Sequence, residues 1–143
     1  MGDLKEMTGP TKVLVVEDNA DDRELLLRQL RKSGFGEQVK FISDGKEALD
    51  FLTGPDGPRM EDLIVILLDL RLPSLSGLEL LRRLRALPKF NTVPVTVMTS
   101  SINPDDLEEC RRLRVVNYVN KPVTFDSFSK AVADVFHSPK PGE

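Results

Sequence analysis

Five short apolar runs alternate along the chain with stretches in which apolar side chains recur at helical spacing. The runs are Lys12–Val16, Val39–Ile42, Leu63–Leu68, Val93–Met98 and Val115–Val119. Strands that are apolar on both faces and alternate with helices are typical of a mostly parallel sheet covered by helices. The pattern therefore predicts an α/β fold with a five-stranded sheet between two helical layers.

The helical spacing predicts five helices. Four cover Ala20–Lys32, Lys46–Leu52, Gly77–Leu87 and Asp105–Arg112, and a fifth follows a Thr124 cap with the apolar stripe Phe125, Phe128, Val132, Val135 and Phe136. Pro104 suits the first turn of its helix. In the third helix leucines form the inward face, and Arg82, Arg83 and Arg85 are expected on the solvent side.

Length and composition describe one soluble domain. The chain has 143 residues, 23 acidic and 20 basic, and a net charge of -3, which gives no electrostatic case for nucleic-acid binding. Cys110 stands alone, so neither an internal disulfide nor a cysteine zinc site is expected, and a buried position is predicted for it. Without a signal peptide or a membrane-spanning run, the chain is expected to be cytoplasmic. We predict a leader over 1–11, the domain over 12–137 and a tail over 138–143.

Polar side chains that could take part in chemistry follow four of the five strands. They are Glu17 and Asp18, then Asp69, then Thr99 with Ser100, and finally Lys121. Parallel strands end at one edge of a sheet, where α/β proteins bind ligands, so these groups are expected to converge. Clustered carboxylates favour a hard divalent cation such as magnesium, and a carboxylate can accept a phosphoryl group. A lysine and a hydroxyl would then stabilise the phosphoryl oxygens.

Each of these residues also has a simpler interpretation. Glu17 and Asp18, like Asp21 and Asp22, would suit the start of a helix through its dipole. Thr99 and Asp69 are common turn residues, and Lys121 could be a solvated lysine beside a turn proline. Their occurrence at four strand ends favours a shared site.

Four segments of the chain resemble the receiver domain of bacterial two-component response regulators. They are Val15–Asn19, Leu67–Pro73 with Gly77, Val97–Ser100 and Tyr118–Pro122. The resemblance runs in order from about Lys12 to Phe136. It implies a flavodoxin-like doubly wound sheet with the strand order 2-1-3-4-5.

The resemblance also implies roles for individual residues. Asp69 would accept a phosphoryl group from a sensor histidine kinase. Asp18, Asp69 and the backbone carbonyl of Arg71 would bind Mg²⁺ directly, and Glu17 would act mainly through water. Thr99 and Lys121 would contact the phosphoryl group, and the Lys121–Pro122 peptide bond would be cis.

Signalling would then depend on a switch pair, Thr99 and Tyr118. Movement of this pair would repack the face formed by the helix over 105–112, the strand over 115–119 and the last helix. Homodimers through that face are expected for the family, with Phe125 and Phe128 as candidate contacts, although core packing explains both phenylalanines equally well. Arg71 and Ser101 occupy positions that tune autodephosphorylation. Tyr118 has the alternative of a half-buried strand aromatic.

Finer features resemble stand-alone receivers, some encoded beside phytochrome-type photoreceptor kinases. These features are the loop over 53–58, the entry Asn19–Asp22 and the triplet Thr99–Ser101. They imply a phytochrome-type kinase partner. Because no DNA-binding domain follows the last helix, the output is expected to be a protein interaction, without nucleic acid or membrane. A carrier that passes phosphate to a histidine phosphotransfer protein is the alternative.

Two other classes fit less well. A haloacid dehalogenase-type phosphatase needs a second acid two residues after its nucleophile, and Arg71 stands there. A flavodoxin-like cofactor binder needs a hydroxyl- and Gly-rich phosphate loop after the first strand, where Glu17 and Asp18 would repel phosphate. The sequence therefore indicates a phosphoacceptor and not an enzyme acting on a separate substrate.

Overall fold

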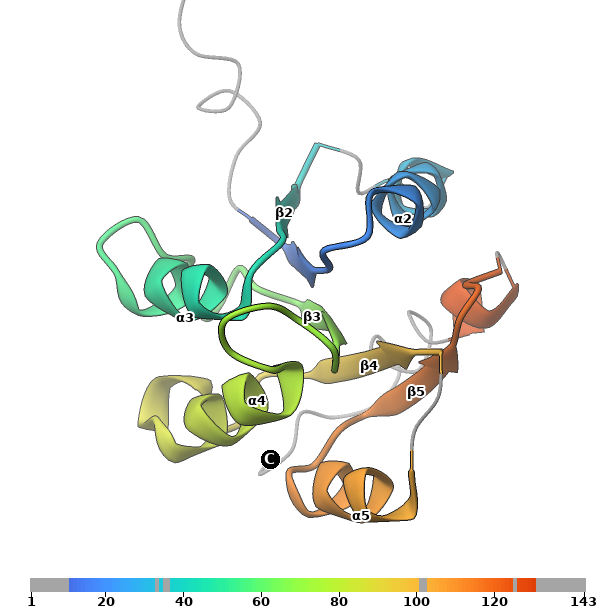
Figure 1. Cartoon of the computed structure of the whole chain (residues 1–143). Coiled ribbons are helices and arrows are strands. Elements are labelled where there is room, and N and C mark those ends of the chain that lie inside the picture. The colour runs from blue at the N-terminus through green and yellow to red at the C-terminus, as the bar shows by residue number, and fades with distance from the viewer. Residues whose placement is uncertain (1–10, 33, 35–36, 101–102, 125, 131–143) are drawn as a thin grey trace, which may run out of the picture.

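The computed structural model describes residues 11–32, 34, 37–100, 103–124 and 126–130. Five strands pair in parallel into one sheet with the order β2-β1-β3-β4-β5, which confirms the predicted doubly wound fold (Figure 1). The strands are β1 Val13–Val16, β2 Val39–Ile42, β3 Val65–Asp69, β4 Val95–Thr99 and β5 Asn117–Asn120.

Helices cover both faces of this sheet. They are α2 Ala20–Lys32, α3 Gly45–Thr53, α4 Gly77–Ala86, the short 3₁₀ helix η1 Pro88–Phe90 and α5 Pro104–Arg112, with a further helical stretch over residues 126–130. In Figure 1, α3, α4 and α5 lie on one face, and α2 lies on the other together with the stretch after Thr124. Pro104 opens α5 as expected, and Thr124 Oγ1 accepts a hydrogen bond from Ser127 N at 3.0 Å. Among the described residues, no helix combines the length and apolar character needed to cross a membrane.

The sheet divides the apolar core into two clusters. Successive side chains of a strand point to opposite faces, so Val15 belongs to the cluster with α2 and Leu14 to the cluster with α3, α4 and α5. Cys110 is fully buried in the second cluster, as predicted. Phe128 is only 2% exposed and packs in the first, so core packing is the interpretation observed for it. Phe125 lies outside the described residues.

Arg85 is buried, so the prediction of a solvent-facing side chain was wrong. Its Nε donates to the carbonyl of Leu113 at 2.7 Å, and its Nη1 donates to the carbonyls of Phe90 at 3.0 Å and Val93 at 2.7 Å. Arg85 stands four residues after Leu81, on the inward face of α4. There the carbonyls of the segments that follow α4 and α5 accept its hydrogen bonds. Burial, and secondarily the charge of Arg114, lowers the pKa of Arg85 to about 10, so its guanidinium stays charged at neutral pH.

The last strand begins two residues later than the apolar pattern predicts. Arg114 has a positive φ of 61°, and the amide of Val115 donates to the carbonyl of Cys110 at 3.1 Å. Val115 therefore belongs to the turn that ends α5, and the strand begins at Asn117. The 3₁₀ helix after α4 was likewise not predicted, because Pro88 indicated only where α4 ends.

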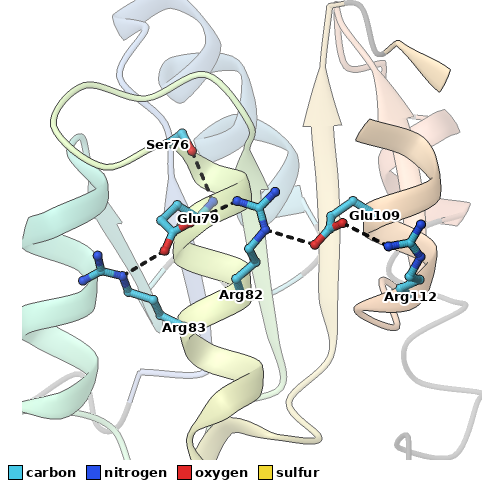
Figure 2. A network of polar contacts seen from close by, with 6 residues as sticks. All are labelled: Ser76, Glu79, Arg82, Arg83, Glu109 and Arg112. Carbon is cyan, nitrogen blue, oxygen red and sulfur yellow. Dashed lines mark hydrogen bonds and ion pairs between the residues drawn. The ribbon is translucent and has the colours of Figure 1, made fainter. Parts of the chain in front are cut away.

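An exposed network of ion pairs joins α4 to α5 (Figure 2). Arg82 pairs with Glu79 in its own helix and with Glu109 of α5, both at 3.0 Å. Arg83 also pairs with Glu79, and Arg112 pairs with Glu109. Exposed pairs contribute under about 1 kcal/mol each, so this network orients two neighbouring helices more than it stabilises the fold.

Candidate functional site

The carboxyl ends of the strands form a pocket lined by charged side chains. Val16 pairs with Leu68 in the sheet, so the residues that follow them, Glu17 and Asp69, are neighbours. The pocket is lined by Glu17, Asp18, Asn19, Asp22, Asp69, Arg71, Ser100, Lys121 and Pro122. The strand-end acids and the lysine, far apart in the sequence, therefore come together at this edge.

Three of the lining carboxylates fit a divalent cation. Glu17, Asp18 and Asp69 each offer one oxygen, and these oxygens lie within 4.8 Å of one another. Glu17 is fully buried and Asp18 is exposed, so the cluster opens to solvent on one side. Burial is the main cause that raises the pKa of Glu17 to about 7, and the charge of Asp69 adds to it, against hydrogen bonds from Lys121 and Asn19. Oxygen ligands with excess negative charge suit Mg²⁺.

Lys121 is the cation that balances the acids. Its Nζ lies 2.6 Å from Glu17 Oε1, 2.8 Å from Asp69 Oδ2 and 2.9 Å from Asp22 Oδ2. Burial by itself lowers the pKa of Lys121, but hydrogen bonds to Asp69, Glu17 and Asp22 outweigh it and raise the pKa above its usual range. Lys121 is therefore an ammonium at every physiological pH. The peptide bond between Lys121 and Pro122 is cis, as the resemblance implies.

The loop after Asp69 is held close to the carboxylate of that residue. The amide of Arg71 donates to Asp69 Oδ1 at 3.0 Å, and the amide of Gly77 donates to the carbonyl of Leu70 at 3.0 Å. A Cβ at Gly77 would collide with the backbone carbonyl of Asp69, so the start of α4 approaches the end of β3 as closely as only glycine permits. Ser74, at a φ of 66°, donates from Oγ to Asp44 Oδ2 at 2.8 Å and ties the loop to the start of α3.

Neither of the expected switch residues is among the residues that line this pocket, although Thr99 directly precedes Ser100, which lines it. Thr99 is 2% exposed at the end of β4, and its carbonyl accepts a hydrogen bond from the amide of Lys121 at 3.0 Å. Tyr118 pairs with Val97 across β4 and β5, and it is half-buried against the cluster that contains Cys110. Both positions are compatible with the expected roles, which stay predictions. Ser101 lies outside the described residues.

Sequence reasoning missed two residues of the site. Asp22, interpreted as a helix-start acid, contacts Lys121. Asn19 caps α2, with Oδ1 accepting from the amide of Asp22 at 2.9 Å, while its own amide donates to Glu17 Oε2 at 3.0 Å. An asparagine three positions before an acid is a recognisable helix start. This pattern does not indicate that Asp22 contacts Lys121, which follows β5.

Comparisons with known proteins identify the family of this chain. The profile of the response regulator receiver domain matches residues 13–133. The probable methanogenesis regulatory protein FilR2 of Methanothrix harundinacea (strain 6Ac) is 34% identical over 94% of this chain and 86% of its own. The bacteriophytochrome response regulator AtBRR is 38% identical, with a TM-score of 0.73 over 92% of this chain and 96% of its own. The Mn(2+)-bound response regulator Rcp1 is 30% identical, with a TM-score of 0.76 over 93% of this chain and 100% of its own.

The matched profile spans most of the chain and includes every strand of the sheet and the acids, the threonine and the lysine at the strand ends. The chain belongs to the response regulator receiver domain family of two-component systems.

Proposed function

We propose that Asp69 of this receiver domain accepts a phosphoryl group from a sensor histidine kinase. The observation that carries the proposal is the 2.8 Å contact between Asp69 Oδ2 and Lys121 Nζ beside the acids Glu17 and Asp18. An acceptor carboxylate, a fixed cation and a cluster of oxygen ligands are the parts that phosphoryl transfer to a carboxylate requires.

The transfer moves the phosphoryl group from a histidine of the kinase to this chain. A carboxylate oxygen of Asp69 forms the new bond to phosphorus, while the bond from phosphorus to the histidine nitrogen breaks. The electron pair of the broken bond stays on that nitrogen. Lys121 neutralises negative charge on the phosphoryl oxygens, and the hydroxyl of Thr99 donates to one of them.

Mg²⁺ is the cofactor that we assign to the acidic cluster. Asp18, Asp69 and the backbone carbonyl of Arg71 would hold it directly, and Glu17 would hold it through water. The bound cation supplies neutralisation of charge on the incoming phosphoryl oxygens. The Mn(2+)-bound form of response regulator Rcp1, which this chain resembles, supports binding of a divalent cation here.

The output is a protein interaction that depends on phosphorylation. Thr99 and Tyr118 would form the switch pair, and Arg71 with Ser101 would set how fast the phosphoryl group is hydrolysed. The responsive surface would comprise α5, β5 and the helix after Thr124, with a homodimer as one assembly. The receiver unit would extend over residues 12–137.

The kinase partner that the relatives favour is of the phytochrome type. AtBRR is described as a bacteriophytochrome response regulator, and this chain is 38% identical to it over most of both chains. A second candidate role is an intermediate carrier that hands the phosphoryl group to a histidine phosphotransfer protein. The two roles share the same chemistry at Asp69 and differ in the acceptor that follows.

Intact mass after incubation with acetyl phosphate and Mg²⁺ tests the acceptor. The wild type should gain one phosphoryl group, and chelation of Mg²⁺ should abolish the gain. Asp69→Asn should gain none, whereas Asp56→Asn, the same change at an exposed loop acid, should behave as the wild type. A gain in Asp69→Asn, or no gain in the wild type, would contradict the proposal.

A further inference from the structure

Lys121 has a third acidic partner that the acceptor chemistry leaves without a role. Asp22 stands in the first turn of α2, and its Oδ2 lies 2.9 Å from Lys121 Nζ. The other two partners, Glu17 and Asp69, come from strand ends and are nearly or fully buried. The side chain of Asp22 is 26% exposed, so it is the partner most open to water.

An ammonium has three N–H donors, and carboxylate oxygens of three residues lie within 2.9 Å of the Lys121 Nζ. A phosphoryl group on Asp69 adds new acceptor oxygens beyond the carboxylate that Lys121 now contacts. Phosphorylation removes the charge of the Asp69 carboxylate and places about two charges on the phosphoryl oxygens, so the Lys121 donor on Asp69 passes to these oxygens first. A second donor that turns to them must leave Glu17 or Asp22. Losing Glu17 would leave a buried carboxylate without its cation, which is costly, whereas Asp22 can be hydrated at once.

We propose that Asp22 is a positioning residue that competes with the phosphoryl group for Lys121. In the unphosphorylated protein Asp22 holds the ammonium on the α2 side of the pocket. On phosphorylation Lys121 exchanges Asp22 for a phosphoryl oxygen. This inference rests on the proposed function, because the competitor is the phosphoryl group on Asp69.

The chain offers a matched control for Asp22 in its neighbour Asp21. Both acids stand in the first turn of α2, and each contributes the same charge to the helix start, but Asp21 is exposed. Asp21→Asn therefore reproduces the loss of charge and of helix stabilisation without loss of the contact to Lys121. Asp22→Glu restores a carboxylate and tests for rescue.

The rate of phosphorylation by acetyl phosphate, followed by intact mass over a series of donor concentrations with Mg²⁺, is the test. Asp22→Asn should lower the half-saturating donor concentration about threefold, the effect of releasing one partly exposed ion pair. Asp21→Asn should change it less, and Asp22→Glu should return it toward the wild-type value. Equal values for Asp22→Asn and Asp21→Asn, or a higher value for Asp22→Asn, would overturn the proposal.

A second readout needs no phosphorylation. In ¹⁵N-labelled protein with chelator, the ammonium resonance of Lys121, identified by its loss in Lys121→Arg, should exchange faster with water in Asp22→Asn than in Asp21→Asn. An unchanged resonance in Asp22→Asn would overturn the positioning role even if the wild type is phosphorylated. Absence of phosphorylation in the wild type would instead overturn the proposed function, with the resonance still testing the contact.

Discussion

Lys121 Nζ lies 2.8 Å from Asp69 Oδ2, although 52 residues separate the two in the sequence. Two further carboxylates, those of Glu17 and Asp22, meet the same nitrogen within 2.9 Å. The lysine therefore stabilises the folded protein, because it keeps neighbouring negative charges together in a partly buried pocket.

Replacing this lysine should make stability depend on divalent cations. Lys121→Met leaves the carboxylates without their counter-charge, so in chelator the free energy of unfolding should fall by about 2 kcal/mol. Added Mg²⁺ should recover most of that loss and should bind more tightly than in the wild type. Urea unfolding with chelator and with Mg²⁺ measures both effects. Lys46→Met, at an exposed pair with Asp50, should show neither; an equal loss with and without Mg²⁺ would contradict the interpretation.

Gly77→Ala should disturb the backbone at Asp69. A methyl group there meets the carbonyl of Asp69 and comes within 2.7 Å of the Cα of Leu70, and neither can move without shifting the end of β3. We expect a loss of about 2 kcal/mol in unfolding free energy, together with weaker Mg²⁺ binding.

Gly34→Ala is the informative comparison for Gly77→Ala. Gly34 has a φ of 89° but nothing within 4 Å of an added Cβ. Gly34→Ala should lower the free energy of unfolding by about 1 kcal/mol through backbone conformation alone, and it should leave Mg²⁺ binding unchanged. If both substitutions weakened Mg²⁺ binding equally, close approach at Gly77 would not be the cause.

Arg85→Ala should be among the most destabilising single changes in α4. It leaves the carbonyls of Leu113, Phe90 and Val93 without a donor in a buried place, which should lower the free energy of unfolding by about 3 kcal/mol. Arg83→Ala, at an exposed position of the same helix, should cost under about 0.5 kcal/mol. Chemical denaturation of the two variants measures this difference. Similar losses in unfolding free energy would mean that the buried hydrogen bonds of Arg85 do not cause the destabilisation.

Alkaline pH should reveal the burial of Cys110. Burial, aided by the charges of Asp106 and Glu109, raises the pKa of this thiol from 9.0 to about 11. Between these values the unfolded chain loses the thiol proton first, so the contribution of Cys110 to stability is complete below pH 9 and is lost as the pH rises through about 11. The difference in unfolding free energy between wild type and Cys110→Ala should shrink over this range. A difference that is constant with pH would contradict the shift.

The apolar pattern was enough to predict the sheet, because the strands are mostly apolar runs with polar residues at their ends. It was also enough to predict where the site lies, since parallel strands place Asp69 and Lys121 at one edge whatever their order. The order itself came only from the resemblance, because periodicity contains no information on which strands are neighbours.

The misplaced residues depend on partners that only the folded chain provides. Arg85 is buried because the carbonyls of Phe90 and Val93 come within reach after α4 ends. Asp22 points into the pocket because β5 delivers Lys121 to it. In both cases a charged residue at a plausible surface position points inward because the fold places an oppositely polarised partner within 3.0 Å of it.

The division of the core by the sheet has a consequence for the evolution of the sequence. Leu30 packs on one side and Leu52 on the other, with the backbone of the strands between them. Replacements at separated positions act nearly independently. The cluster on one face of the sheet can therefore change its aliphatic residues through compensating replacements while the cluster on the other face stays the same. Two related chains can then share the strand-end acids and the lysine and still differ in most of one cluster.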